Sequence, residues 1–183
     1  MDFNKVLYER KTIRTYSSKE VSNEIILEII KAAQIAPSAK NRQPWRFYIL
    51  NNEQKNHICH LMYEWDKKNK NEKTSVKGSA NQMTQSNKVI MIFSPIYKSK
   101  NKNIYYKKTD YLSLGAAIEN MSLKCVELGL GSCWCADTLY LDEEINQYLN
   151  IKGYEQISAL LIGYPKKIPQ TAKRFNLNDL ILS

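Results

Sequence analysis

The sequence predicts a fold in which helices and strands mix around a small mixed sheet, of either the α/β or the α+β class. Apolar residues recur at helical spacing in several segments, and short apolar runs between these segments fit buried strands. The chain has 183 residues, of which 43% are hydrophobic, so its length fits one domain, residues 1–183, with a sizeable core. No internal repeat and no linker divides it.

Five segments show the features of helices. Ser22 is a suitable N-cap for the second, which must end near Ala36 because Pro37 disfavours the helical conformation in the residue before it. Asp110 and Asp142 are expected to cap the fourth and the fifth. The expected helices cover residues 2–9, 23–36, 53–66, 111–128 and 143–149.

Four short segments fit strands of the sheet. Residues 89–93 and 157–163 are apolar at consecutive positions, as expected for strands that are buried on both faces. Residues 67–87 are polar and rich in lysine, and we expect them to form a mobile excursion. The expected strands cover residues 45–50, 89–93, 132–136 and 157–163.

Several features of the chain indicate a cytoplasmic protein. No apolar run approaches the ~20 residues that a membrane helix needs. The N-terminus lacks the apolar core and the cleavage site of a signal peptide. The four cysteines are too few to staple a chain of this length, so we expect thiols in a reducing compartment.

The net charge of +9 indicates an anionic partner or a well-solvated surface. Lysines gather in residues 67–77 and 98–108, and tyrosines accompany the second stretch. Basic residues among aromatic ones are also typical of proteins that bind single-stranded nucleic acid. No nucleic-acid-binding motif accompanies them, so a solvated face is the favoured interpretation. The sequence leaves the role of the stretches 67–87 and 97–108 open.

Most kinds of catalytic and metal site are excluded by what the sequence lacks. It has neither a Walker-type phosphate loop nor a G-x-G-x-x-G motif. A Ser-His-Asp triad would need His57 or His60, and no nucleophile elbow lies near either. The spacing of His57, Cys59 and His60 fits no zinc pattern, so we expect a helix with two exposed histidines and one packed cysteine.

A basic cluster near the N-terminus is the first candidate for ligand binding. Arg10, Lys11, Thr12 and Arg14 bring three positive charges and a hydroxyl into five residues. Guanidinium and ammonium groups suit a phosphate, and the hydroxyl adds a donor. Such clusters are also common as plain surface charges, so the cluster alone does not identify a site.

The second candidate is the loop that follows Pro37. It supplies Ser38, Asn41 and Gln43, and amide side chains offer both donors and acceptors. That combination suits the edge of a planar heterocycle with carbonyl and ring-nitrogen atoms. It also fits a polar turn whose side chains bond their own backbone.

The order of these motifs along the chain resembles the flavin-dependent nitroreductases. The resemblance covers nearly the whole chain, and the Pro37 loop together with the glycine-rich turn is its most specific part. The similar segments are Arg10-Lys-Thr-Ile-Arg14, Pro37-Ser-Ala-Lys-Asn-Arg-Gln-Pro-Trp45, Asp110-Tyr-Leu-Ser-Leu-Gly-Ala-Ala-Ile-Glu-Asn-Met121, Gly129-Leu-Gly-Ser-Cys-Trp134 and Leu160-Leu-Ile-Gly-Tyr-Pro165.

This resemblance implies an α+β fold with a central mixed or antiparallel sheet flanked by helices. It also implies an intertwined homodimer that binds flavin mononucleotide (FMN) at the subunit interface, with part of the Pro37 loop coming from the partner. The positions that match the family's FMN-binding residues are Arg10, Lys11, Thr12, Arg14, Pro37, Ser38, Ala39, Asn41, Gln43, Cys135, Ala136, Lys173 and Arg174.

By the same resemblance, the expected activity is an oxidoreductase that takes hydride from NADH or NADPH and reduces nitroaromatic or quinone-type acceptors by a ping-pong mechanism. Arg14 near the pyrimidine edge would stabilise the reduced flavin. Alternatives are an FMN enzyme of this fold with another reaction (dehydrogenation, dehalogenation or flavin destruction) or, less favoured, a basic nucleic-acid-binding module. Cys135 and Ala136 depart from the family's usual aliphatic residue and glycine, and we expect Cys135 to be inert.

Overall fold

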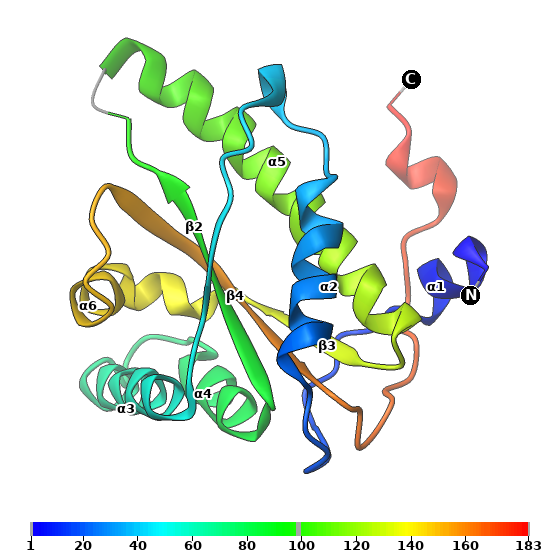
Figure 1. Ribbon diagram of the computed structural model, residues 1–183, viewed down its shortest axis with the longest axis horizontal. Helices are drawn as coiled ribbons and strands as arrows, with labels where there is room; N and C mark the ends of the chain where they lie inside the picture. Colours follow the sequence, from blue (N-terminus) through cyan, green and yellow to red (C-terminus); the bar gives the residue numbers. More distant parts are fainter. Residues whose placement is uncertain (1, 98–99, 183) are drawn as a thin grey trace.

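The computed structural model describes residues 2–97 and 100–182, and the side chains of residues 100–103 lie outside that description. Its centre is a four-stranded sheet in the order β1-β2-β4-β3, in which each neighbouring pair is antiparallel (Figure 1). The sheet is therefore the antiparallel form of the expected one. The strands are β1 (Arg46–Ile49), β2 (Lys88–Pro95), β3 (Gly131–Cys135) and β4 (Tyr154–Gly163).

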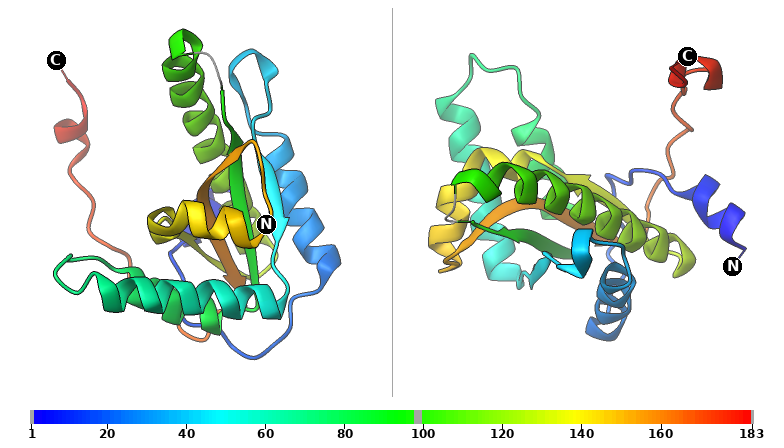
Figure 2. Two further views of the ribbon diagram at one scale, coloured as in Figure 1. Left: turned by 90° about the vertical axis from the view of Figure 1, so that its left-hand side faces the viewer. Right: turned by 90° about the horizontal axis from the view of Figure 1, so that it is seen from above.

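Two helical layers cover the sheet, one on each face (Figures 1 and 2). Ile90 and Ile92 of β2 point toward the layer of α2 and α5, while Val89 and Met91 point toward the layer of α3 and α4. This alternation follows from the period of two along a strand and explains why residues 89–93 of β2 are apolar at consecutive positions. The helices are α2 (Asn23–Gln34), α3 (Asn52–Lys68), α4 (Val76–Gln85) and α5 (Lys100–Glu127).

The helix ends follow the capping rules at several predicted places. The Ser22 hydroxyl accepts a hydrogen bond from the Ile25 amide (3.4 Å), as expected of the N-cap of α2. Gly129, with a φ of 72°, ends α5, and the Leu130 amide behind it donates to the Cys125 carbonyl (2.7 Å). In α3, Cys59 is packed in the core and both histidines are exposed, as predicted.

The expectation of a mobile excursion over residues 67–87 was wrong. Helix α4 occupies its second half and packs against α3 on one face of the sheet. Val76, Ala80 and Met83 are fully buried in the same core cluster as β2. They lie four and three residues apart, which is helical spacing, but the lysines and amides around them conceal it.

Neither aspartate caps its expected helix. Helix α5 begins at Lys100, so Asp110 lies inside it and is fully buried. Asp142 lies within α6 (Asp142–Tyr148), and its Oδ1 accepts hydrogen bonds from the Gln156 amide (2.7 Å) and from Nδ2 of Asn146 (2.9 Å). Both carboxylates therefore bind groups outside the first turn of a helix.

The two ends of the chain project from the body (Figure 2). The Lys166 amide donates to the Thr15 carbonyl (3.0 Å), and the chain then runs outward to a short 3₁₀ turn, η3 (Leu177–Leu180). In α1 (Phe3–Glu9), Val6 is buried. The exposed apolar side chains of the two ends are Phe3, Leu7, Tyr8, Ile168, Phe175, Leu177, Leu180, Ile181 and Leu182. Among the described helices, none is long and apolar enough to cross a membrane.

Candidate functional site

The basic segment of residues 10–14 lies along the edge strand β3. Thr12 forms a parallel bridge with Ser132, and the Ile13 amide donates to the Ser132 carbonyl (2.9 Å). Ile13 is buried directly over Gly131, where the β-carbon of any other residue would overlap its side chain. The close approach of the segment to β3 thus depends on glycine at this position.

The charged groups of this segment lie at the surface. Arg10 pairs through Nε with Glu119 of α5 (3.2 Å), and both side chains are partly exposed. Lys11 lines a hollow of about 400 Å³ together with Gly131 and Pro165. Arg14 is exposed. Exposed or partly exposed cations such as Arg14 and Lys11 are available to an anionic ligand, in contrast to charges that are buried in ion pairs.

The predicted residues at the end of β3 divide between the core and the surface. The Cys133 and Cys135 side chains are buried toward α3 and α4, whereas Trp134 points to the α5 face. Burial raises the pKa of Cys133 to about 11 and also raises the pKa of Cys135, so both thiols keep their protons at neutral pH. Ala136 is exposed. The backbone at this end is fixed, since the Ser158 hydroxyl donates to the Cys135 carbonyl (2.9 Å).

The loop of residues 37–45 has an unusual backbone. Lys40, Asn41 and Gln43 have φ angles of 54°, 51° and 48°, in the left-handed region that residues other than glycine rarely adopt. The Ser38 hydroxyl accepts a hydrogen bond from the Gln43 amide (3.1 Å) and closes the loop. The Asn41 and Gln43 side chains are exposed, so their amide groups are free to meet a ligand from outside the chain.

Within one chain, the predicted site residues form three separate groups. The loop lies against Leu112, Ser113 and Ala116 of α5, whereas Arg10 pairs with Glu119 of the same helix. At 1.5 Å per residue, Ser113 and Glu119 are about 9 Å apart along the axis. Lys173 and Arg174 line another hollow on the C-terminal arm. The loop and Arg10 therefore contact α5 fewer than two helical turns apart.

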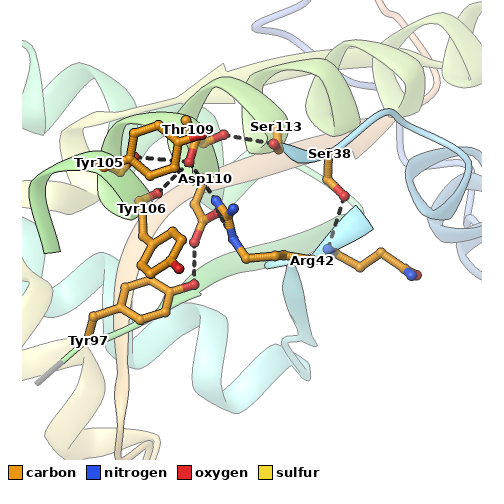
Figure 3. A network of polar contacts seen from close by, with 9 residues as sticks. Ser38, Arg42, Tyr97, Tyr105, Tyr106, Thr109, Asp110 and Ser113 are labelled. Carbon is orange, nitrogen blue, oxygen red and sulfur yellow. Dashed lines mark hydrogen bonds and ion pairs between the residues drawn. The ribbon is translucent and has the colours of Figure 1, made fainter. Parts of the chain in front are cut away.

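A polar network that the sequence did not predict joins the loop to α5 (Figure 3). Arg42 donates from Nε to Oδ1 of Asp110 (3.2 Å), and its Nη2 bonds the same oxygen and Oγ1 of Thr109. The Tyr97 hydroxyl donates to Oδ2 of Asp110 (2.6 Å), and the ring of Tyr106 lies under the guanidinium, 4.6 Å from Cζ.

A signal for this network was present in the sequence. The buried stripe of α5 includes Leu114 and Ala117, and its period extends back to position 110. An acidic residue on a buried stripe requires a cationic partner, and Arg42 in the adjacent motif supplies one. Nη1 of Arg42 is buried and, within the described part of the chain, has no hydrogen-bond acceptor.

The fold and these residues define an α+β protein with a cationic edge and a strained polar loop. The chain belongs to the nitroreductase family: the sequence model of the "Nitroreductase family" matches residues 7–164.

Known relatives agree with this assignment along most of the chain. It is 30% identical to a "Putative NADH dehydrogenase/NAD(P)H nitroreductase" of Archaeoglobus fulgidus over 88% of this chain and 84% of that protein. It is 24% identical to the "Putative NAD(P)H nitroreductase YfhC" of Bacillus subtilis over 95% and 90% of the two chains. The solved structure of a "putative nitroreductase in complex with fmn" from Desulfovibrio desulfuricans has the same fold, with a TM-score of 0.81, 22% identity and coverage of 100% of this chain and 96% of that chain.

Proposed function

We propose that this protein is an FMN-dependent oxidoreductase that takes hydride from NADH or NADPH and reduces nitroaromatic or quinone-type acceptors by a ping-pong mechanism. The observation that carries the proposal is the cationic segment of residues 10–14, held against the edge of the sheet in a chain of the nitroreductase family. Residues 1–183 would act as one FMN-binding domain.

The donor set at this edge fits a phosphorylated flavin. Arg10, Lys11 and Thr12 would hold the phosphate and ribityl chain, and they are partly exposed along β3. Lys173 and Arg174 are fully at the surface of the arm and would approach the same phosphate from the partner or from the same chain. Guanidinium groups bind phosphate oxygens in bidentate fashion, which suits this role.

Three further groups of residues would contact the flavin ring. Ser38, Ala39, Asn41 and Gln43 would reach it from the loop, with Pro37 setting the start of the loop. Arg14, exposed next to β3, would place a positive charge near the pyrimidine edge. Cys135 and Ala136 would contact the reactive edge of the ring through their backbone atoms.

A homodimer would bring these groups together. As the family resemblance implies, the loop of one protomer would complete the site of its partner, while the basic segment would hold the flavin phosphate. The exposed apolar side chains of α1 and of the arm give a second reason, because such surface is stable when another chain covers it. A monomer that keeps its flavin in sedimentation experiments would contradict the dimeric site.

The chemistry then requires little of the side chains. Bound FMN would supply the two-electron step, accepting hydride from the nicotinamide and passing the electrons to the acceptor. Arg14 would stabilise the negative charge that reduction leaves on the ring, and the fixed β3 backbone would orient the ring. The buried thiols of Cys133 and Cys135 would stay protonated and take no part.

The decisive experiment is the absorbance spectrum of the freshly purified protein. We expect flavin bands that NADH or NADPH bleaches under anaerobic conditions and that a nitroarene or quinone restores. Flavin bands that neither nicotinamide bleaches would point to another reaction of the same fold. A colourless protein that FMN cannot reconstitute would refute the proposal, and salt-dependent binding of single strands by that protein would indicate a nucleic-acid-binding module.

A further inference from the structure

The Asp110 carboxylate is held from two sides. Among the described residues, it is the only acidic side chain in the buried class. Its Oδ1 accepts from Arg42 and its Oδ2 accepts from Tyr97 (2.6 Å), so both oxygens have partners. A buried charge persists in a protein only when it is paired and hydrogen-bonded. Because Asp110 is buried, its carboxylate needs the guanidinium of Arg42 beside it, and this requirement fixes where the Arg42 side chain lies.

Arg42 lies between the two loop residues that would face the flavin. Asn41 and Gln43 both have positive φ angles, 51° and 48°, and such a backbone persists only where its surroundings hold it. The Ser38 hydroxyl holds the outer side of the loop through the Gln43 amide. On the inner side, the Arg42 side chain reaches into the body of the protein and ends on Asp110 (Figure 3).

We infer that Arg42 and Asp110 form a positioning pair for the flavin-facing loop. Their ion pair holds the backbone on either side of Arg42 in the left-handed conformation that presents Asn41 and Gln43 outward. This inference rests on the proposed function, since it takes the loop to be a flavin contact. Neither Arg42 nor Asp110 needs to touch the flavin, because they act through their neighbours in the chain.

The pair also gives the tyrosines of residues 97–108 a structural role. Tyr97 follows β2 and bonds Asp110, while the Tyr106 ring lies beside Arg42 and 5.2 Å from the Tyr97 ring. Burial, followed by the bond to Asp110, raises the pKa of Tyr97, so its hydroxyl stays a donor. Tyr97 and Tyr106 thus contact the two members of the pair, one on each side.

The test compares variants of the pair with a matched control. Arg42→Met and Asp110→Asn each remove the ion pair, and the double variant removes both partners. Arg42→Lys keeps the charge but loses the two-pronged geometry of the guanidinium. Lys107→Met is the control, because Lys107 lies on the same helix as Asp110 but forms its ion pair with Glu155 of β4 (2.8 Å).

The first measurement is the dissociation constant of FMN, titrated into apoprotein by flavin fluorescence below the unfolding temperature of every variant. We expect Arg42→Met and Asp110→Asn each to raise it about tenfold, with the double variant no weaker than either single variant, as for coupled residues. Arg42→Lys should fall between wild type and Arg42→Met. Lys107→Met should bind FMN as wild type does, even if its unfolding temperature falls.

The visible circular dichroism of the bound flavin provides a second readout, because it reports the surroundings of the ring. It should change in both pair variants and not in the control. Pair variants that bind FMN within about twofold of wild type, or whose effects add fully in the double variant, would overturn the inference and leave the proposed function standing. Wild-type apoprotein that binds no FMN would overturn both. If Asp110→Asn does not fold, the same FMN titration and circular dichroism are carried out on Arg42→Lys and Tyr97→Phe, and FMN binding within about twofold of wild type in both would overturn the inference.

Discussion

Replacing Gly131 with alanine should push the basic segment away from β3. The added β-carbon would overlap the Cβ, Cγ1 and Cγ2 atoms of Ile13, a branched side chain that is 4% exposed. Overpacking of this kind costs about 1–3 kcal/mol. We expect the upper part of that range, because moving Ile13 also stretches the hydrogen bond from its amide to the Ser132 carbonyl (2.9 Å).

Gly78 provides the matched control for this change. It lies in α4, and no atom would come within 4 Å of a β-carbon there. Gly78→Ala should therefore stabilise the fold by about 0.5–1 kcal/mol through helix propensity. The free energy of unfolding of both apoproteins, measured in urea by circular dichroism, should move in opposite directions from wild type.

The same pair of variants tests the role of the segment. If residues 10–14 hold the flavin phosphate, Gly131→Ala should weaken FMN binding and Gly78→Ala should not. A Gly131→Ala protein as stable as wild type would refute the packing argument. A destabilised Gly131→Ala protein with unchanged FMN affinity would show that the approach of the segment to β3 does not position the phosphate site.

The Arg10–Glu119 ion pair and the buried Cys133 thiol each give a further prediction. Arg10→Ala should weaken FMN binding by about 1.5–3 kcal/mol, the worth of a hydrogen bond to a charged group, and Glu119→Gln should strengthen it by freeing Arg10, both measured by titration. Equal affinities in the two variants would refute the Arg10 contact. Burial raises the pKa of Cys133 from 9.0 to about 11, so the native state gains stability that is complete below pH 9 and lost as the pH rises toward 11. The urea midpoint of wild type should therefore fall more steeply between pH 9 and 11 than that of Cys133→Ala, and parallel curves would contradict this.

The sequence predicted the elements whose apolar residues form a clear pattern. The strand around Met91 and the helix after Ser22 both appear close to their expected bounds. Helix α4 was not predicted, because polar residues separate Val76, Ala80 and Met83, and a segment rich in polar residues is typical of a loop. The first turns of α5 were missed for a similar reason, since lysine, asparagine and tyrosine dominate residues 100–109.

The candidate site was predictable as a set of residues but not as an arrangement. The order of motifs along the chain grouped Arg10 with the loop that contains Asn41. Local sequence patterns could not show that Arg10 and this loop contact α5 at different points along the helix. The Arg42–Asp110 pair depends on a contact between residues 68 positions apart. Local propensity carries no information on such contacts, and only the burial of position 110 could have suggested one.

The separation of the loop from the basic segment bears on how a dimer of this chain would be built. Both groups lie along one side of the α2–α5 layer, and exposed apolar residues, Ile35 (81% exposed) and Leu112 (75% exposed), flank them. In a dimer with twofold symmetry, if surface A of one protomer contacts surface B of its partner, then surface B of the first protomer also contacts surface A of the partner. If the loop of one protomer reaches the cations of its partner, the reverse contact follows, and Ile35 and Leu112 become buried between them. The proposed dimer would then hold two equivalent flavins, each bound by residues of both chains.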